Sequence, residues 1–172
     1  MMSSDFETRI SLEVFQRHFL VTHLKDETAG VLDQLERRAS QSGKSFSTLL
    51  AECVKSRFPK EAHFQEDCWY AREIPLYGCY FAHSDFRKHP VPKDERFVDF
   101  MPTKREEIDL GSFPYSSEIR APWSETPMPQ PVVSERKIGK YYVLDGQLRV
   151  IRHWYHQVLN VKVFVYRGKL DV

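Results

Sequence analysis

The pattern of apolar and polar residues is clearest between Tyr141 and Tyr166. Tyr141 to Leu144 is a short run of β-forming residues, and Asp145-Gly146 interrupts it. Gln147 to Leu159 then has a helical period, and Val161 to Tyr166 is again β-branched and aromatic. The pattern therefore predicts a β-α-β unit with a glycine turn between its first strand and its helix.

The predicted helix has two chemically different faces. Its buried stripe is expected to consist of Leu148, Ile151, Tyr155, Val158 and Leu159. Its other face is cationic and consists of Arg149, Arg152, His153 and His156. A glycine turn lets a ligand approach the backbone, and the first N–H groups of a helix favour an anion. The alternative is a purely structural turn beside a solvated basic surface.

The sequence Asp145-Gly146-Gln147-Leu148-Arg149 resembles the D-G-x-x-R signature of the ParB/sulfiredoxin superfamily. Upstream, Glu118 to Pro122 (EIRAP) is similar to the I-R-P segment of that superfamily, and the resemblance covers roughly residues 108–168. It implies a turn that holds nucleotide phosphates or forms the site of a ParB-like nuclease. Gln147 stands where sulfiredoxins have a reactive cysteine, which argues against their reductase chemistry. Leu148 stands where the superfamily usually has His or Arg, which removes one phosphate donor.

The N-terminal part is predicted to be mainly helical. An apolar run from His18 to Leu24 suggests a strand, followed by helices over about Glu27 to Ala39 and Ser47 to Phe58, with Ser45 or Ser47 as the cap. This order resembles the ribbon-helix-helix DNA-binding family, and the alternative is a helical module that packs on the C-terminal domain. We therefore expect an α+β protein with a helical module at 1–65 and a ParB/sulfiredoxin-like domain at 66–172, built on a small mixed sheet.

Three other features of the sequence bear on possible binding sites. Ser42-Gly43-Lys44-Ser45 ends like a P-loop but lacks the first glycine and joins two helices. Residues 90–131 hold eight of the ten prolines, and we expect an ordered, extended connection that delivers Glu118 and Arg120 to the glycine turn. Four residues are of a type that binds zinc, although their spacing fits no compact finger: Cys68, Cys79, His83 and His89.

Composition and charge narrow the functional classes. The chain of 172 residues is 41% hydrophobic and has a net charge of +1, with three cysteines and no apolar run long enough for a membrane span. A cytoplasmic location is expected. Residues 132–172 hold eight Lys/Arg against three Asp/Glu, whereas residues 1–131 are acidic overall. A local positive field near the glycine turn favours polyphosphate or DNA as the partner.

These observations predict a site made of carboxylates and arginines. Its expected catalytic residues are Glu118, Asp145 and Arg149, and Glu118 and Asp145 are also expected to hold Mg²⁺ or Mn²⁺. The expected phosphate-binding residues, for ATP or another nucleotide, are Arg120, Gly146, Gln147, Arg149, Arg152 and His153. His153 is a candidate general acid or base. Structural salt bridges are the alternative use of the same charged groups.

The main functional expectation is a ParB-like protein that acts on DNA as a metal-dependent DNase with ATP binding or hydrolysis. Among superfamily members, the chain most resembles plasmid fertility-inhibition proteins of the Osa type, which implies a role in blocking conjugative or T-DNA transfer. One alternative is a non-enzymatic DNA-binding regulator that uses a ribbon-helix-helix module. Another is a protein that docks on secretion or conjugation machinery through its aromatic and proline-rich residues 63–131.

Overall fold

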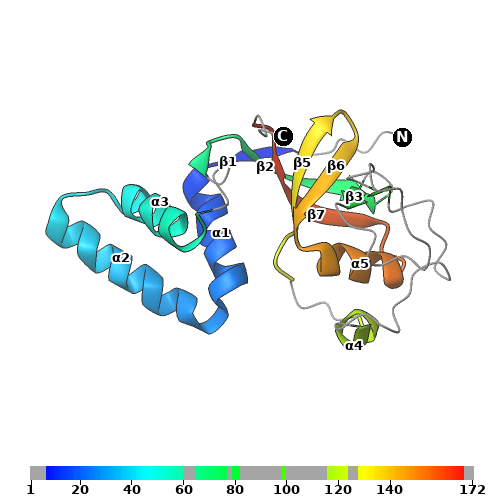
Figure 1. The fold of residues 1–172 in the computed structure, drawn as a ribbon, viewed down its shortest axis with the longest axis horizontal. Helices are drawn as coiled ribbons and strands as arrows, with labels where there is room; N and C mark the ends of the chain where they lie inside the picture. The colour runs from blue at the N-terminus through cyan, green and yellow to red at the C-terminus, as the bar shows by residue number, and fades with distance from the viewer. Residues whose placement is uncertain are drawn as a thin grey trace. The chain divides into compact units, whose positions relative to one another are not determined.

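The computed structural model describes residues 7–59, 65–76, 79–81, 98–99, 116–123 and 128–168. The chain divides into two compact units (Figure 1). The sheet unit comprises Met1–Thr8 and Tyr70–Arg167, and the helical unit comprises Arg9–Trp69 and Gly168–Val172. Most of the expected extended connection at 90–131, together with His83 and His89, lies outside the described residues.

The helical unit is built from three helices. They are α1 (Leu12–Leu24), α2 (Thr28–Ser42) and α3 (Phe46–Arg57), and the 3₁₀ turn η1 (Lys25–Glu27) joins the first two. The hydroxyl of Ser45 caps α3 by accepting a hydrogen bond from the Thr48 N–H at 3.2 Å. Gly43, in the left-handed region at φ 70°, ends α2. Helix, glycine turn and helix therefore follow one another as predicted, and residues 42–45 form a helix-helix connection.

The core of the helical unit corrects one prediction. His18 to Leu24 is not a strand but the second half of α1. Phe15, Phe19 and Leu20 are all buried, and their spacing places them on one helix face that packs inward, where the Phe15 ring stacks on Trp69. Ser11 caps this helix, which extends it well before the apolar run. The ribbon-helix-helix interpretation thus loses the strand on which it depended.

The strands form a mixed sheet in the order β1-β2-β7-β5-β6-β3-β4. Their bounds are β1 Thr8–Ile10, β2 Trp69–Pro75, β3 Cys79–Phe81, β4 Val98–Asp99, β5 Val132–Lys137, β6 Lys140–Asp145 and β7 Asn160–Tyr166. β5 runs antiparallel to β6 and parallel to β7, while β3 runs parallel to β6 and antiparallel to β4. The α+β class with a mixed sheet is therefore confirmed. In the predicted β6-α5-β7 unit, β5 lies between the two flanking strands.

Helix α5 (Gln147–Tyr155) covers one face of this sheet, and the short helix α4 (Ser116–Arg120) lies beside α5 (Figure 1). Val150 and Ile151 are completely buried, and Leu148 and Tyr155 pack at the edge of the same core. Alternating positions of the strands supply the sheet side of this core. Among them are Val133, Val143, Val161, Val163 and Val165.

The predicted helix stripe is correct at its centre and wrong at its C-terminal end. Leu159 is 68% exposed, because α5 ends at Tyr155 and Gln157 adopts a positive φ of 59° that turns the chain away. Val150, which the predicted stripe omitted, is buried instead. Among the described residues, no helix combines the length and the apolar character that a membrane crossing requires.

Candidate functional site

The turn between β6 and α5 is shaped around one arginine. Gly146 has φ 86° and is the N-cap of α5, where its carbonyl accepts hydrogen bonds from the N–H groups of Arg149 and Val150. A Cβ atom at Gly146 would lie 2.7 Å from Nη2 of Arg149 and 2.8 Å from Cζ. Glycine is favoured here because the backbone is left-handed, and a Cβ atom would also displace the guanidinium of Arg149 from its place over the turn.

The Arg149 side chain donates hydrogen bonds to three groups of the protein. Nη1 donates to the carbonyl oxygens of Pro129 at 2.7 Å and Gln130 at 3.1 Å, and Nη2 donates to Oδ2 of Asp145 at 3.0 Å. The arginine side chain is only 15% exposed. Burial lowers the pKa of Arg149 from its ordinary value, and the carboxylate of Asp145 opposes that change. The arrangement is a three-acceptor clasp, which we call the Arg149 clasp.

The rest of the predicted basic face is covered in the same way. Nη2 of Arg152 donates to the carbonyl of Pro122 at 2.8 Å, and Nε2 of His156 lies 3.1 Å from the carbonyl of Ile119. The ring of Trp123 meets His153 edge-on at a centroid distance of 4.9 Å. We call Ile119–Trp123 and Met128–Gln130 the covering segments, because their backbone carbonyls and the Trp123 ring occupy this side of α5.

His153 is held as a neutral group. Its Nδ1 lies 2.7 Å from the carbonyl of Arg149, which can only accept, so Nδ1 bears the proton. Burial lowers the pKa of His153, and the charge of Arg152 lowers it further, against the backbone hydrogen bond that raises it. An uncharged imidazole under the Trp123 ring contributes no cation to phosphate binding at neutral pH.

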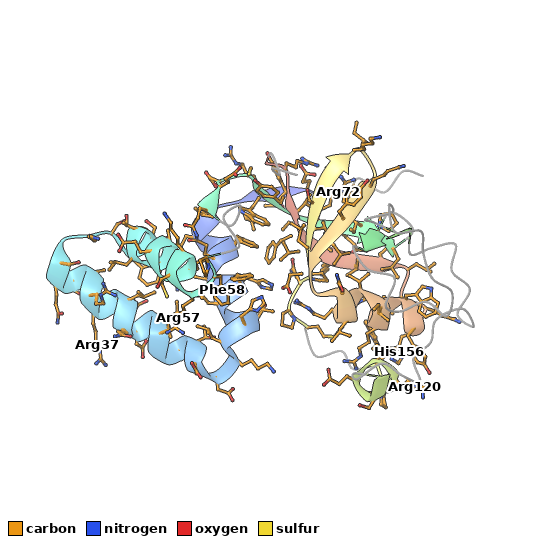
Figure 2. All side chains as sticks on the ribbon, viewed as in Figure 1. Arg37, Arg57, Phe58, Arg72, Arg120 and His156 are labelled. Carbon is orange, nitrogen blue, oxygen red and sulfur yellow. The ribbon has the colours of Figure 1, made fainter. Side chains whose placement is uncertain are left out.

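Two predicted site residues lie at the far end of α5 from the glycine turn. The His156 contact with Ile119 places α4 at the C-cap of this helix, and Figure 2 shows Arg120 close to His156. Ten residues separate Gly146 from His156, which corresponds to about 15 Å along a helix axis. Both Glu118 and Arg120 are exposed. Contrary to the sequence-based expectation, the structure therefore does not bring Glu118 and Arg120 to the glycine turn.

Glu118 and Asp145 do not form the divalent-metal pair that the sequence predicts. Asp145 is bound to Arg149, and Glu118 lies at the opposite end of α5. Within the part of the chain that the structure describes, no group of three His, Cys, Asp or Glu side chains could hold a metal ion. Gln147 begins α5 and is half-buried, and the triphosphate of ATP would have to displace the carbonyls of Pro129 and Gln130 from Arg149.

Two of the four candidate zinc ligands, Cys68 and Cys79, lie among the described residues. Cys79 is buried in β3, next to Tyr141 of β6 in the register of the sheet. Cys68 belongs to the helical unit, where its Sγ lies 3.7 Å from Oε2 of Glu66. The two cysteines thus belong to different units.

A second charged cluster in the sheet unit was not predicted. Arg167 at the end of β7 donates to the carboxylates of Glu7 and Glu135 and lies over the ring of Tyr70. Burial raises the pKa of Tyr141 to about 12, and neighbouring Glu135 raises it as well. Sequence alternation could have placed Glu135 and Tyr141 on one sheet face, but no local signal indicates that Glu7 joins them from the other end of the chain.

Comparison of the chain with protein-family models, with curated proteins and with solved structures finds no match. The resemblance to the ParB/sulfiredoxin superfamily therefore depends on the residues of the chain itself, above all Asp145, Gly146 and Arg149.

Proposed function

We propose that this chain is a ParB/sulfiredoxin-fold protein that acts on DNA by binding it. The observation that supports this proposal is the charge balance around β5, β6 and β7. Between residues 132 and 168 the acidic residues are Glu135 and Asp145, and each is paired with an arginine. The three lysines of this region are all exposed: Lys137, Lys140 and Lys162. Its surface charge is therefore positive, which favours the phosphate backbone of a nucleic acid.

The family assignment within this proposal is supported by the contacts among the residues of the D-G-x-x-R sequence. Asp145 holds Arg149, Arg149 lies over Gly146, and the glycine leaves room for both. These three residues act as a unit that fixes the start of α5 and attaches Met128–Gln130 to it. We assign them a positioning role, in which they hold the basic strands and α5 in place.

Binding is favoured over metal-dependent cleavage because the two carboxylates expected to hold the metal do not come together. Asp145 is paired with Arg149 at the start of α5, whereas Glu118 belongs to α4, which meets the other end of α5. The resemblance also implies inhibition of conjugative or T-DNA transfer, and we propose that DNA binding contributes to this inhibition. The transfer machinery would then be a second partner of the protein.

The test is a titration of a dye-labelled duplex with the purified protein, followed by fluorescence anisotropy over a range of salt concentrations. We expect micromolar or tighter binding whose logarithm falls linearly with the logarithm of the salt concentration. Plasmid DNA incubated with the protein and Mg²⁺ or Mn²⁺ should remain uncut. Absence of salt-dependent binding would overturn the proposal. Cutting that is lost in a folded Arg149→Lys variant would instead establish the nuclease.

A further inference from the structure

The β5–β6 hairpin extends beyond the strands on either side of it. β7 pairs with β5 as far as Ser134, and β3 pairs with β6 from Tyr141 onward. Between these points Lys137 and Lys140 pair with each other across a two-residue turn. Figure 1 shows this end of the hairpin projecting from the sheet. We call Lys137–Lys140 the hairpin tip.

The turn of this hairpin contains Ile138, a residue type that two-residue hairpin turns do not favour. Ile138 is 99% exposed, the largest exposed fraction among the described apolar residues. Two-residue hairpin turns favour Asn, Asp or Gly, and Gly139 at φ 76° already supplies the left-handed position. Among the described residues, neither packing nor turn geometry accounts for a branched apolar side chain at this place. Its exposure makes it available for a contact with a partner.

The charge around Ile138 indicates the kind of partner. Lys137 and Lys140 flank it and are exposed, and Arg136 adds a third cation to the sequence within five residues. The carboxylate of Glu135, two residues before Lys137, pairs with Arg167 at 2.8 Å and accepts a hydrogen bond from the Gly139 N–H at 3.4 Å. The tip is therefore cationic around one apolar side chain.

We propose that the hairpin tip enters a groove of duplex DNA, with Lys137 and Lys140 at the phosphates and Ile138 wedged against a base step. Two-stranded β-ribbons also bind in the minor groove of DNA, and proteins that bind there insert apolar wedges, isoleucine among them, between base steps. The minor groove is therefore the one that the hairpin tip would enter. A lipid surface is the poorer partner, because one isoleucine buries too little apolar area to anchor a hairpin. This inference rests on the proposed function and names the surface that performs it.

The test uses the full chain and four single variants in the anisotropy assay. Ile138→Ala should weaken duplex binding roughly tenfold and should reduce the bending of a duplex labelled at both ends, measured by energy transfer. Lys137→Ala should lower the slope of log affinity against log salt by about one. Leu159→Ala is the matched control for Ile138→Ala, since Leu159 is an exposed apolar residue of the same unit away from the tip, and it should bind and bend DNA as the unmodified chain does. Lys162→Ala removes an exposed lysine of the same positive surface away from the tip, and it should lose less affinity than Lys137→Ala and leave the bending of the duplex unchanged.

The outcomes separate this inference from the proposed function. Tight binding by the unmodified chain with no loss in Ile138→Ala and Lys137→Ala would overturn the hairpin assignment and leave DNA binding intact. Equal losses in Lys137→Ala and Lys162→Ala would also overturn it, because a diffuse positive surface would then suffice. No DNA binding by any variant would overturn both proposals. Ile138-dependent binding to phosphatidylserine vesicles without DNA binding would show the tip to be a membrane contact and overturn both.

Discussion

The basic face of α5 and the tip of the β5–β6 hairpin are both rich in cations, but they use them in opposite ways. On α5, Arg149 and Arg152 donate to backbone carbonyls of the covering segments, and partial burial lowers the pKa of His153. At the hairpin tip, the side chains of Lys137 and Lys140 are exposed. A run of cationic residues in a sequence can therefore become part of the packing of the fold or remain at the surface, and the sequence alone does not distinguish the two.

The largest effect that this difference predicts is at the Arg149 clasp. Arg149→Ala should lower the free energy of unfolding by about 3 kcal/mol, because it removes a largely buried guanidinium that donates to the carboxylate of Asp145 and to two backbone carbonyls. Urea denaturation followed by tryptophan fluorescence measures the change. A phosphate-binding arginine on an open surface would cost far less when it is removed.

Two control variants sharpen the result. Arg149→Lys should fall between the alanine variant and the unmodified chain, since one ammonium group cannot reach three acceptors as a guanidinium does. Lys162→Ala, at an exposed position on β7, should change stability by less than about 0.5 kcal/mol. If Arg149→Ala is as mild as Lys162→Ala, the clasp does not hold the covering segments.

The second prediction concerns the glycine beneath that arginine. Gly146→Ala should cost about 2 kcal/mol, from the left-handed backbone and from the clash of its Cβ with the guanidinium. In the Arg149→Ala background the clash is absent, so the same substitution should cost only about 1 kcal/mol. A double-mutant cycle by urea denaturation gives this coupling energy. Strictly additive losses would show that the guanidinium does not lie over the turn in solution.

Sequence periodicity predicted the local elements because their signals are local. Ser45 and Gly43 mark helix ends by their side-chain and backbone chemistry, and Asp145-Gly146 marks the turn before α5. The run from His18 to Leu24 was misread because it covers less than two helical turns, too short to separate the periods of strand and helix. The parallel pairing of β5 with β7 has no sequence signal, since it depends on where the chain returns after α5.

The side chains of the candidate site could be predicted from the sequence, but the backbone groups that accept hydrogen bonds from its arginines could not. The D-G-x-x-R spacing brought Asp145 and Arg149 together as expected. The acceptors that occupy the guanidinium groups are the carbonyls of Pro129, Gln130 and Pro122, and any residue type offers a carbonyl. Glu118 was expected at the site from its carboxylate and from the resemblance of its segment to the I-R-P segment, and the length of α5 keeps it away.

The smallest expected effect is the titration of His153. Its pKa is lowered below the ordinary 6.5 by burial, so the folded chain resists protonation that the unfolded chain accepts. Stability should therefore be fully present above pH 6.5 and decrease as the pH falls below that value, and His153→Gln should reduce this dependence. Denaturation at several pH values measures the stability, and NMR titration of the imidazole Cε1–H gives the pKa directly.

Trp123→Ala is the variant that connects this titration to the covering segments. The indole ring lies edge-on to His153 at 4.9 Å, so its removal should admit water and move the pKa of His153 back toward 6.5. A pKa of His153 already at 6.5 in the unmodified chain would mean that the covering segments leave α5 open, and its basic face would then be as available to phosphate as the hairpin tip.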